Sequence, residues 1–379
     1  MLTTSIDHPA WIEIDLAQFK KNIALIRKEI GQTKLCLPVK ANAYGHGLIP
    51  IAQAAVAAGV DYLAVSCLQE GARLRKADIQ IPILVLGAID ADQIPELLRH
   101  HLELSIASLY KARLVAQKCK ELQKKCNIHL EIDTGMQRTG VRPQTALHLF
   151  NELKNTEYLE IVGIYSHLAT ADEPHDSFAA TQIQTFKKIS NEIKNLLNKP
   201  ILCHLSGSAS VCNYPESLFD MVRPGLLSFG YFPNTEKKID GIAPCLTLKA
   251  KISYFKVVPT QTGISYGHTY KTQTQSRIIT IPVGYGDGFR RALSNQGSVI
   301  VHGRRYPIAG MICMDQLMVD IGHNEAHVGD EVILIGKNGS AEITLAEIAQ
   351  RCDTIPYEIL CGFNDRLPRI YRDNPENMD

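Results

Sequence analysis

The hydrophobic positions between residues 16 and 240 gather into short apolar runs that alternate with longer segments of helical period. Such alternation is typical of repeated βα units around a parallel sheet. There are eight apolar runs: Cys36–Val39, Tyr62–Ser66, Ile83–Leu86, Leu102–Ile106, Ile128–Asp133, Ile161–Tyr165, Leu202–Leu205 and Phe219–Val222. Eight parallel strands favour closure into a TIM-like (β/α)8 barrel, and an open doubly wound sheet is the alternative.

After about Pro244 the pattern changes to short β-rich runs with glycine and proline between them, which predicts a mostly β domain. The runs are Leu246–Tyr254, Arg277–Val283, Gly297–His302, Leu317–Ile321 and Glu331–Ile335. One helix is expected to interrupt them, because Thr344 can cap the run Leu345–Arg351 and Glu347 completes a capping box.

The pattern therefore predicts three segments. Residues 1–15 contain a strand-like stretch, Trp11–Ile14, that we expect to pair with the C-terminal domain. Residues 16–240 form the barrel, and residues 241–379 form the β-rich domain. A chain of 379 residues is long enough for both cores.

The charge balance gives no sign of a nucleic-acid partner, since 40 Lys and Arg residues face 39 Asp and Glu residues. The chain begins MLTTSIDHPAWIEID, which lacks the n-region and h-region of a secretion signal. No apolar run reaches the roughly 18 residues of a membrane span. We therefore expect a cytoplasmic protein with no membrane partner.

Cysteine and histidine spacings do not predict a metal site. The ten cysteines include no Cys-x-x-Cys pair, which leaves reduced thiols as the expectation. The segment His323–His327 lacks the order of an HExxH motif. Gly284–Gly288 is likewise not a GxGxxG helix opening.

Lys40 is the first candidate for chemistry, because it directly follows the first apolar run and so belongs at the carboxyl end of a barrel strand. Four of the five preceding residues are apolar, and an amine lodged against them has a lowered pKa suited to Schiff-base formation. A lysine that lies along the barrel rim with its ammonium in water is the alternative.

The nine residues Val39–Gly47, Val-Lys-Ala-Asn-Ala-Tyr-Gly-His-Gly, closely resemble the pyridoxal-phosphate lysine motif of alanine racemases. Further matches follow in order along nearly the whole chain: Asp133–Met136 with Arg138, Ser166–Asp172, Arg223–Gly225, Ser265–Gly267, Gly284-Tyr285 with Asp287-Gly288, Cys313–Gln316 and Tyr357-Glu358. The resemblance implies an isomerase that interconverts L-alanine and D-alanine, with pyridoxal 5'-phosphate as cofactor. It also implies a homodimer with shared active sites that supplies D-alanine for peptidoglycan.

The resemblance assigns a set of cofactor-binding residues: Lys40, Tyr44, His167, Ser208, Arg223, Gly225, Leu226 and Tyr357. Ser208 follows the seventh run and Gly225 the eighth, where barrel enzymes bind phosphate. Arg223 is implied to face the pyridine nitrogen and, because a guanidinium stays protonated, to keep that nitrogen unprotonated. Singly, the serine reads as a helix cap, the glycine as a turn residue and the arginine as a carboxylate partner.

Inverting an α-carbon requires a proton to leave one face and arrive on the other, so two acid/bases are the natural solution. Lys40 is one, and Tyr266 matches the family's second, which the partner subunit contributes. A tyrosine starts from a pKa of about 10 and needs help from cationic or donor groups. The resemblance links it to Arg223 through His167 and His204, although either histidine alone reads as a core residue.

The resemblance also implies substrate contacts around these two groups. Arg138 and the backbone N–H of Met314 are implied to bind the substrate carboxylate. Cys313 and Asp315 belong to the same loop as Met314. The residues similar to those of the family's substrate access channel are Asp172, Tyr285 and Arg291.

Two positions depart from the family pattern. At Glu131 many members carry a carbamylated lysine that presents a carboxylate to the arginine here numbered Arg138. A glutamate supplies that anion directly, so we expect no carbamylated lysine and activity insensitive to bicarbonate. At Gly207 the family often has asparagine before the phosphate serine, which bears on local loop geometry.

Three rival functions remain at this point. An amino-acid decarboxylase of the same architecture generally places an acidic residue on the pyridine nitrogen, unlike Arg223. A serine or broad-specificity racemase is closer, but its usual export signal is absent. A non-catalytic pyridoxal-phosphate carrier could share the lysine motif and the barrel, but it lacks a second domain and Tyr266.

Overall fold

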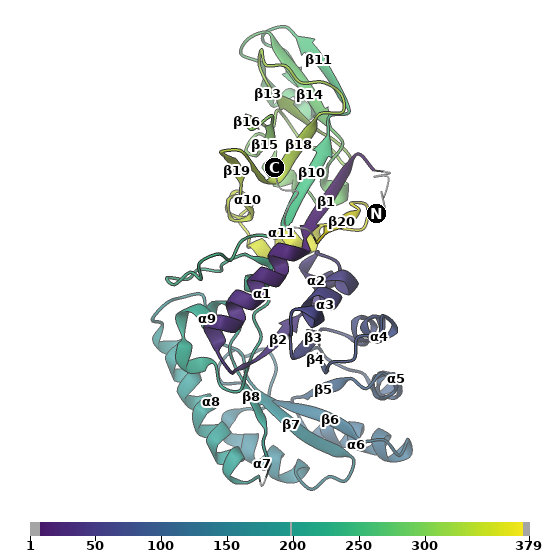
Figure 1. Ribbon diagram of the computed structural model, residues 1–379, viewed down its shortest axis with the longest axis vertical. Helices are drawn as coiled ribbons and strands as arrows, with labels where there is room; N and C mark the ends of the chain where they lie inside the picture. Colours follow the sequence, from purple (N-terminus) through teal and green to yellow (C-terminus); the bar gives the residue numbers. More distant parts are fainter. Residues whose placement is uncertain (1–7, 198, 374–379) are drawn as a thin grey trace. The chain divides into compact units, whose positions relative to one another are not determined.

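The computed structural model describes residues 8–197 and 199–373, and its contacts divide them into two compact units (Figure 1). The barrel unit comprises the described residues of 18–43 and 47–244. The β unit comprises those of 1–17, 44–46 and 245–379. In the part of the chain that is described, no helix is long and apolar enough to cross a membrane.

Eight parallel strands close into a barrel in chain order, which confirms the predicted (β/α)8 architecture. The strands are β2 (Lys34–Pro38), β3 (Tyr62–Val65), β4 (Ile83–Val85), β5 (Glu103–Ile106), β6 (Cys126–Glu131), β7 (Leu159–Tyr165), β8 (Leu202–His204) and β9 (Met221–Val222). Each coincides with one apolar run, because strands covered on both faces need apolar residues at consecutive positions.

Helices follow the strands around the barrel (Figure 1). They are α1 (Leu16–Ile30), α2 (Lys40–Tyr44), α3 (Leu48–Ala57), α4 (Leu68–Lys76), α5 (Ile94–Arg99), α6 (Leu109–Glu121), α7 (Pro143–Leu153), α8 (Ser177–Asn195) and α9 (Ser208–Asn213), with 3-10 turns η1 (Ala91–Gln93), η2 (Pro215–Ser217) and η3 (Leu226–Phe229). Helix α8 shows why they form: Asp176 caps it by accepting from the amide of Phe178, and its buried residues recur every three to four positions.

The β unit is built from short, mostly antiparallel strands. They are β1 (Ala10–Asp15), β10 (Leu246–Lys251), β11 (Tyr254–Val258), β12 (Gly263–Ile264), β13 (Tyr270–Lys271), β14 (Ser276–Ile281), β15 (Ser298–Val301), β16 (Arg304–Pro307), β17 (Leu317–Asp320), β18 (Glu331–Asn338), β19 (Ala341–Ile343) and β20 (Arg369–Arg372). Strand β1 pairs antiparallel with β10 and parallel with β20. This mostly β unit matches the predicted fold class.

The helices of the β unit are only partly as predicted. Helix α10 (Leu345–Arg351) begins where expected, with the Thr344 hydroxyl accepting from the amide of Glu347 at 3.1 Å. A second helix, α11 (Pro356–Gly362), was not predicted. It opens with a proline and has no side-chain cap, so it lacks the polar residue that marks most helix starts. Three short 3-10 turns complete the unit: η4 (Tyr266–His268), η5 (Tyr285–Asp287) and η6 (Arg291–Leu293).

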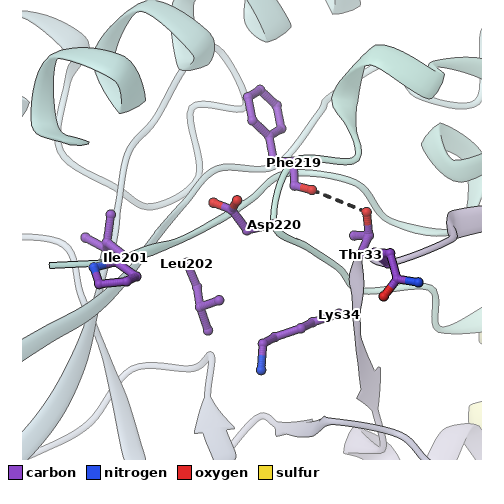
Figure 2. A pocket seen from close by; sticks show the side chains of 8 residues that line it. Thr33, Lys34, Ile201, Leu202, Phe219 and Asp220 are labelled. Carbon is purple, nitrogen blue, oxygen red and sulfur yellow. Dashed lines mark hydrogen bonds between the residues drawn. The ribbon is translucent and has the colours of Figure 1, made fainter. Parts of the chain in front are cut away.

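The two ends of the barrel differ in what they carry. At the amino ends of β2, β8 and β9 lies an open hollow of about 430 Å³, where the Thr33 hydroxyl bonds to the carbonyl of Phe219 (Figure 2). The family-matched residues of the barrel unit follow the strands instead, as Lys40 does after β2 and Arg223 after β9. Chemistry is therefore expected at the carboxyl ends, as in other barrels.

Candidate active site

The candidate residues fall into two groups, one in each unit. The barrel unit contains Lys40, Glu131, Arg138, His167, Asp172, His204, Ser208, Arg223, Gly225 and Leu226. The β unit contains Tyr44, Tyr266, Tyr285, Arg291, Cys313, Met314, Asp315 and Tyr357.

Lys40 begins a left-handed helical turn. The four residues after it, Ala41–Tyr44, have φ between 52° and 54°. The turn is closed by a hydrogen bond from the amide of Ala43 to the carbonyl of Val39, at 2.8 Å. A left-handed turn costs roughly 1–2 kcal/mol per L-residue, so the surrounding structure must impose it. Strain of this kind gathers at functional sites and points to a fixed place for the Lys40 amine.

Two side chains hold this turn. Oε1 of Glu70, in the first turn of α4, accepts from the amide of Ala41 at 2.7 Å, and Oε2 accepts from the amide of Ser66 at 2.8 Å. The side chain of Asn42 accepts from the amide of Leu48 at 2.8 Å. The sequence reading missed Glu70, because a glutamate in a helix's first turn has the ordinary explanation of a favourable helix dipole.

Arg223 is buried and makes three hydrogen bonds. Its Nη1 lies 2.6 Å from Nδ1 of His204, and its Nη2 donates to the carbonyls of Ser166 and Leu205 at 2.7 Å and 3.1 Å. It forms no ion pair with a carboxylate in the described part of the chain, so the reading of Arg223 as a carboxylate partner does not apply. Its Nε–H has no acceptor among the same residues and can donate to a ligand.

An aromatic side chain supports this pair. The ring of Tyr165, the last residue of β7, stacks on His204 with centroids 5.0 Å apart and an interplanar angle of 14°. The Cζ of Arg223 lies 5.2 Å from the centroid of the same ring. Burial, together with Arg223 and His129, holds the pKa of His204 well below its usual value, so this imidazole stays neutral.

His167, in the loop after β7, differs from His204 because its ring nitrogens have no hydrogen-bond partner in the described residues. Burial, followed by the charges of Arg223, Arg138 and Lys40, lowers the pKa of His167 to about 3. A neutral imidazole with a free nitrogen can exchange a hydrogen bond with an incoming hydroxyl group. The reading of His167 as a satisfied core histidine therefore does not fit.

The two loops expected to bind phosphate contact each other. The Ser208 hydroxyl, at the start of α9, accepts from the amide of Leu227 in η3 at 3.1 Å. Both α9 and η3 begin in these loops, and amides at helix starts favour anions. A Cβ built on Gly207 meets only Cε1 of His167, at 3.8 Å, which is ordinary contact. The departure at this position thus leaves the loop unstrained.

Glu131, the last residue of β6, is buried and bonded to hydroxyl groups. Its Oε1 accepts from Thr139 at 2.6 Å and its Oε2 from Ser105 at 3.5 Å. Arg138, in the following loop, is exposed and forms no ion pair with Glu131 within the described ranges. The carboxylate therefore stands ready in the barrel without a cationic partner.

The candidates of the β unit are largely exposed. The side chains of Tyr266, Met314 and Tyr285 are 72%, 53% and 43% exposed. Tyr285 and Met314 belong to two loops that are bonded together, since the amide of Tyr285 donates to the carbonyl of Cys313 at 3.1 Å. Arg291 and Asp315 are exposed as well. Large apolar surface of this kind commonly marks a binding or subunit interface.

The two tyrosines assigned to phosphate lie together in the β unit. The rings of Tyr44 and Tyr357 have centroids 6.0 Å apart and an interplanar angle of 48°. The backbone between them is tightly packed, because a Cβ on Gly45 would lie 2.2 Å from the carbonyl oxygen of Leu360. Position 45 also has a φ of 79°, so it requires glycine on two counts.

The whole chain is similar to known proteins of one kind. The family described as "Alanine racemase, N-terminal domain" matches residues 14–233, and "Alanine racemase, C-terminal domain" matches residues 245–371. An alanine racemase from Halothermothrix orenii is 40% identical over 371 residues, which is 97% of this chain and 98% of that protein. One from Symbiobacterium thermophilum is 38% identical over 366 residues, covering 96% and 97%.

Solved structures agree with these relatives. The structure of alanine racemase from Clostridium difficile 630 superposes with a TM-score of 0.91 at 35% identity, covering 98% of this chain and 97% of that one. An alanine racemase from Bartonella henselae, described with covalently bound pyridoxal phosphate, superposes with a TM-score of 0.87 at 26% identity, covering 96% and 99%.

Proposed function

The chain belongs to the alanine racemase family, and from this premise we propose that Lys40 and Tyr266 are the two acid/bases with which it interconverts L-alanine and D-alanine. Each would exchange a proton with the substrate α-carbon on its own face. The observation that carries this proposal is the strained turn at the carboxyl end of β2, which fixes the Lys40 amine where barrel enzymes place their chemistry.

We propose that the barrel unit holds pyridoxal 5'-phosphate, because its donor groups suit that molecule. Lys40 offers an amine, the loops of Ser208 and Gly225 offer helix-start amides for a phosphate, and Arg223 offers an unpartnered Nε–H for a ring nitrogen. The cofactor, when bound, withdraws electrons from the substrate α-carbon and thereby makes its proton acidic.

Arg223 separates racemization from other reactions of this cofactor class. A guanidinium only donates hydrogen bonds and keeps its proton at any working pH, so the ring nitrogen that it faces stays unprotonated. This weakens electron withdrawal and favours rapid return of a proton to the α-carbon. An acidic partner at this position, as in a decarboxylase, would have the opposite effect.

His167 gives the Tyr266 hydroxyl a place to bond. Its neutral ring has a free nitrogen beside the positive charges of Arg223, Arg138 and Lys40. Positive charges nearby stabilise a phenolate and so lower the pKa of a tyrosine placed there. Arg138 is proposed to bind the substrate carboxylate through its guanidinium, with the backbone N–H of Met314 as the second donor.

We propose that the Tyr266 that completes each site comes from the partner subunit of a homodimer, because this side chain is 72% exposed within one chain. Complementation tests this. Lys40→Ala and Tyr266→Phe proteins, each inactive, are mixed under conditions that exchange subunits. Since half of the dimers become hybrids with one intact site each, about a quarter of the native activity is expected to return. A mixture that stays inactive contradicts shared sites.

The decisive experiment is solvent-deuterium incorporation at Cα, measured with L-alanine and D-alanine separately on the cofactor-loaded protein and on Tyr266→Phe. Label that accumulates mainly in the antipodal product from both directions, together with a crippled variant, supports two-base racemization. Exchange without inversion contradicts it and favours a carrier. Turnover of serine without turnover of alanine favours a racemase of different specificity.

A further inference from the structure

A continuous chain of hydrogen bonds runs through the barrel interior from Arg223 to a buried glutamate. Nη1 of Arg223 lies 2.6 Å from Nδ1 of His204, and Nε2 of His204 lies 2.9 Å from Nδ1 of His129. Nε2 of His129 lies 2.8 Å from Oε2 of Glu103. The three strands involved are β8, β6 and β5, and all four side chains are buried.

The direction of every bond in this chain is fixed by Arg223. A guanidinium has no acceptor, so it must donate to His204, whose Nδ1 is therefore unprotonated. The proton of His204 then sits on Nε2 and is donated to Nδ1 of His129. The proton of His129 sits on its own Nε2 and is donated to Glu103. Both imidazoles are thereby neutral and each has one defined tautomer.

The backbone makes room for this chain. A Cβ built on Gly163, in β7 between β6 and β8, would lie 2.0 Å from Nδ1 of His129. The φ of Gly163 does not require glycine, so the missing side chain serves space rather than conformation. The pairing of β6 with β7 also shifts register between Ile128 and His129, an irregularity of the kind that re-aims a side chain.

Glu103 is suited to end the chain because both of its oxygens accept. Oε1 accepts from Nδ2 of Asn127 at 3.1 Å, and Oε2 accepts from His129. Burying a guanidinium is costly unless a negative charge or strong acceptors compensate. Arg223 has no carboxylate in direct contact within the described residues, and the two neutral rings connect it to one.

We propose that Glu103 is a positioning residue for Arg223 and that it acts through His129 and His204. The carboxylate fixes the tautomer of both rings, and the correct tautomer of His204 fixes the orientation in which Arg223 presents its free Nε–H. The inference rests on the proposed role of Arg223. It extends that role to two residues, Glu103 and His129, that lie beyond reach of any ligand at the carboxyl end of the barrel.

The chain can be tested on the cofactor-free protein by NMR after 15N labelling of histidine. In the native protein we expect two histidines that carry a slowly exchanging proton on Nε2 and none on Nδ1. Both signals should change in Glu103→Gln, because a glutamine can accept from only one of Asn127 and His129 and must turn its NH2 toward the other donor. Glu160→Gln, an exposed change in the neighbouring β7, is the matched control.

Gly163→Ala provides a second route, since it displaces His129 and leaves every charge in place. It is expected to disturb the same two signals. A native protein with a proton on Nδ1 of His204, or unchanged signals in both variants, overturns the inference. Either result leaves the deuterium-exchange test of Lys40 and Tyr266 untouched, so the two failures are distinguishable.

The effect on the reaction is measured with loaded enzyme. Glu103→Gln is expected to lower kcat roughly 10-fold or more, and KM for alanine to change by less than about twofold, because a lost charge-assisted bond reorients Arg223 rather than the substrate. Glu103→Asp keeps the carboxylate and should recover part of kcat. A Glu103→Gln enzyme that is less stable but has native kcat assigns the chain a structural role only and overturns the proposal.

Discussion

Oε1 of Glu70 lies 2.7 Å from the backbone nitrogen of Ala41, the residue directly after Lys40. Its other oxygen lies 2.8 Å from the backbone nitrogen of Ser66, just past the end of β3. One carboxylate thus ties the left-handed turn after the first barrel strand to the end of the second. Hydrogen bonds to a charged group are among the stronger ones, which suits a turn that local energetics disfavour.

Replacing Glu70 with glutamine should destabilise this turn. The amide NH2 would face one of the two backbone N–H groups, so we expect the free energy of unfolding to fall by about 1–3 kcal/mol. Urea unfolding of the cofactor-free protein measures it. Glu96→Gln in the first turn of α5 loses the same helix-dipole interaction without touching Lys40, and equal losses in both variants would contradict the assignment.

Glu131→Gln should weaken binding of the substrate carboxylate by leaving Arg138 without a nearby anion to orient it. We expect KM for alanine to rise roughly 10-fold, as for the loss of one charge-assisted interaction. The native enzyme should be indifferent to added bicarbonate, because a glutamate needs no carbamylation. Steady-state kinetics with and without bicarbonate measure both effects. An unchanged KM in the variant refutes the role of Glu131.

His167 should make the protein lose stability in acid. Its pKa in the folded chain is about 3, whereas an unfolded histidine has about 6.5, so only the unfolded chain takes up this proton between those values. Its contribution to stability is complete above about pH 6.5 and is lost as the pH falls toward 3. His204 has a pKa shifted in the same direction and adds to the effect.

Substituting His167 by glutamine should therefore flatten the acid side of the stability profile without abolishing it. The measurement is urea unfolding at about pH 4.5 and about pH 7.5, where the difference between the two values is smaller for the variant. His175→Gln serves as the control, since that side chain is 82% exposed. A variant whose profile parallels the native one argues against a buried neutral His167.

Ser208→Ala should weaken anion binding at the paired loops. Inorganic phosphate is expected to raise the thermal midpoint of the cofactor-free native protein, and the variant should need roughly 5–10-fold more phosphate for the same shift. Ser190→Ala removes another buried hydroxyl, which bonds within α8, and controls for general destabilisation. Equal phosphate responses in all three proteins would place the anion elsewhere.

The sequence revealed the barrel because each of its strands is covered on both faces and therefore consists of consecutive apolar residues. The ends of the runs were less certain. The eighth run was expected from Phe219, but this residue has a φ of 49° and so stands outside β9, which is only Met221–Val222. A positive φ at a phenylalanine is imposed by tertiary packing and leaves no local signal.

In the β unit the sequence reading missed strands that face solvent. The predicted run Leu246–Tyr254 is divided into β10 and β11, which belong to different sheets. Strand β11 exposes Tyr254 and Val257, so it carries no alternation between buried and exposed residues that a reader could follow. Partly exposed strands are specified by their neighbours more than by their own composition.

At the site, the motif residues were recognisable and their supports were not. Lys40 and Arg223 stand at positions where a barrel places chemistry, and the family resemblance names their partners. Glu103 and His129 act across 26 and 75 positions of sequence separation, on His129 and His204 respectively. The available signal was a charged or ring-polar residue inside an apolar run, which requires a buried partner but does not say which.

The space that Gly163 leaves for the ring of His129 links the two positions as a unit of sequence variation. An alanine at 163 is incompatible with a histidine at 129, yet it would be tolerated beside a smaller residue there, so the two substitutions must be strongly non-additive. Chains of this fold are therefore expected to exchange both residues together or neither. A library randomised at one of the two positions alone would return only the native pair.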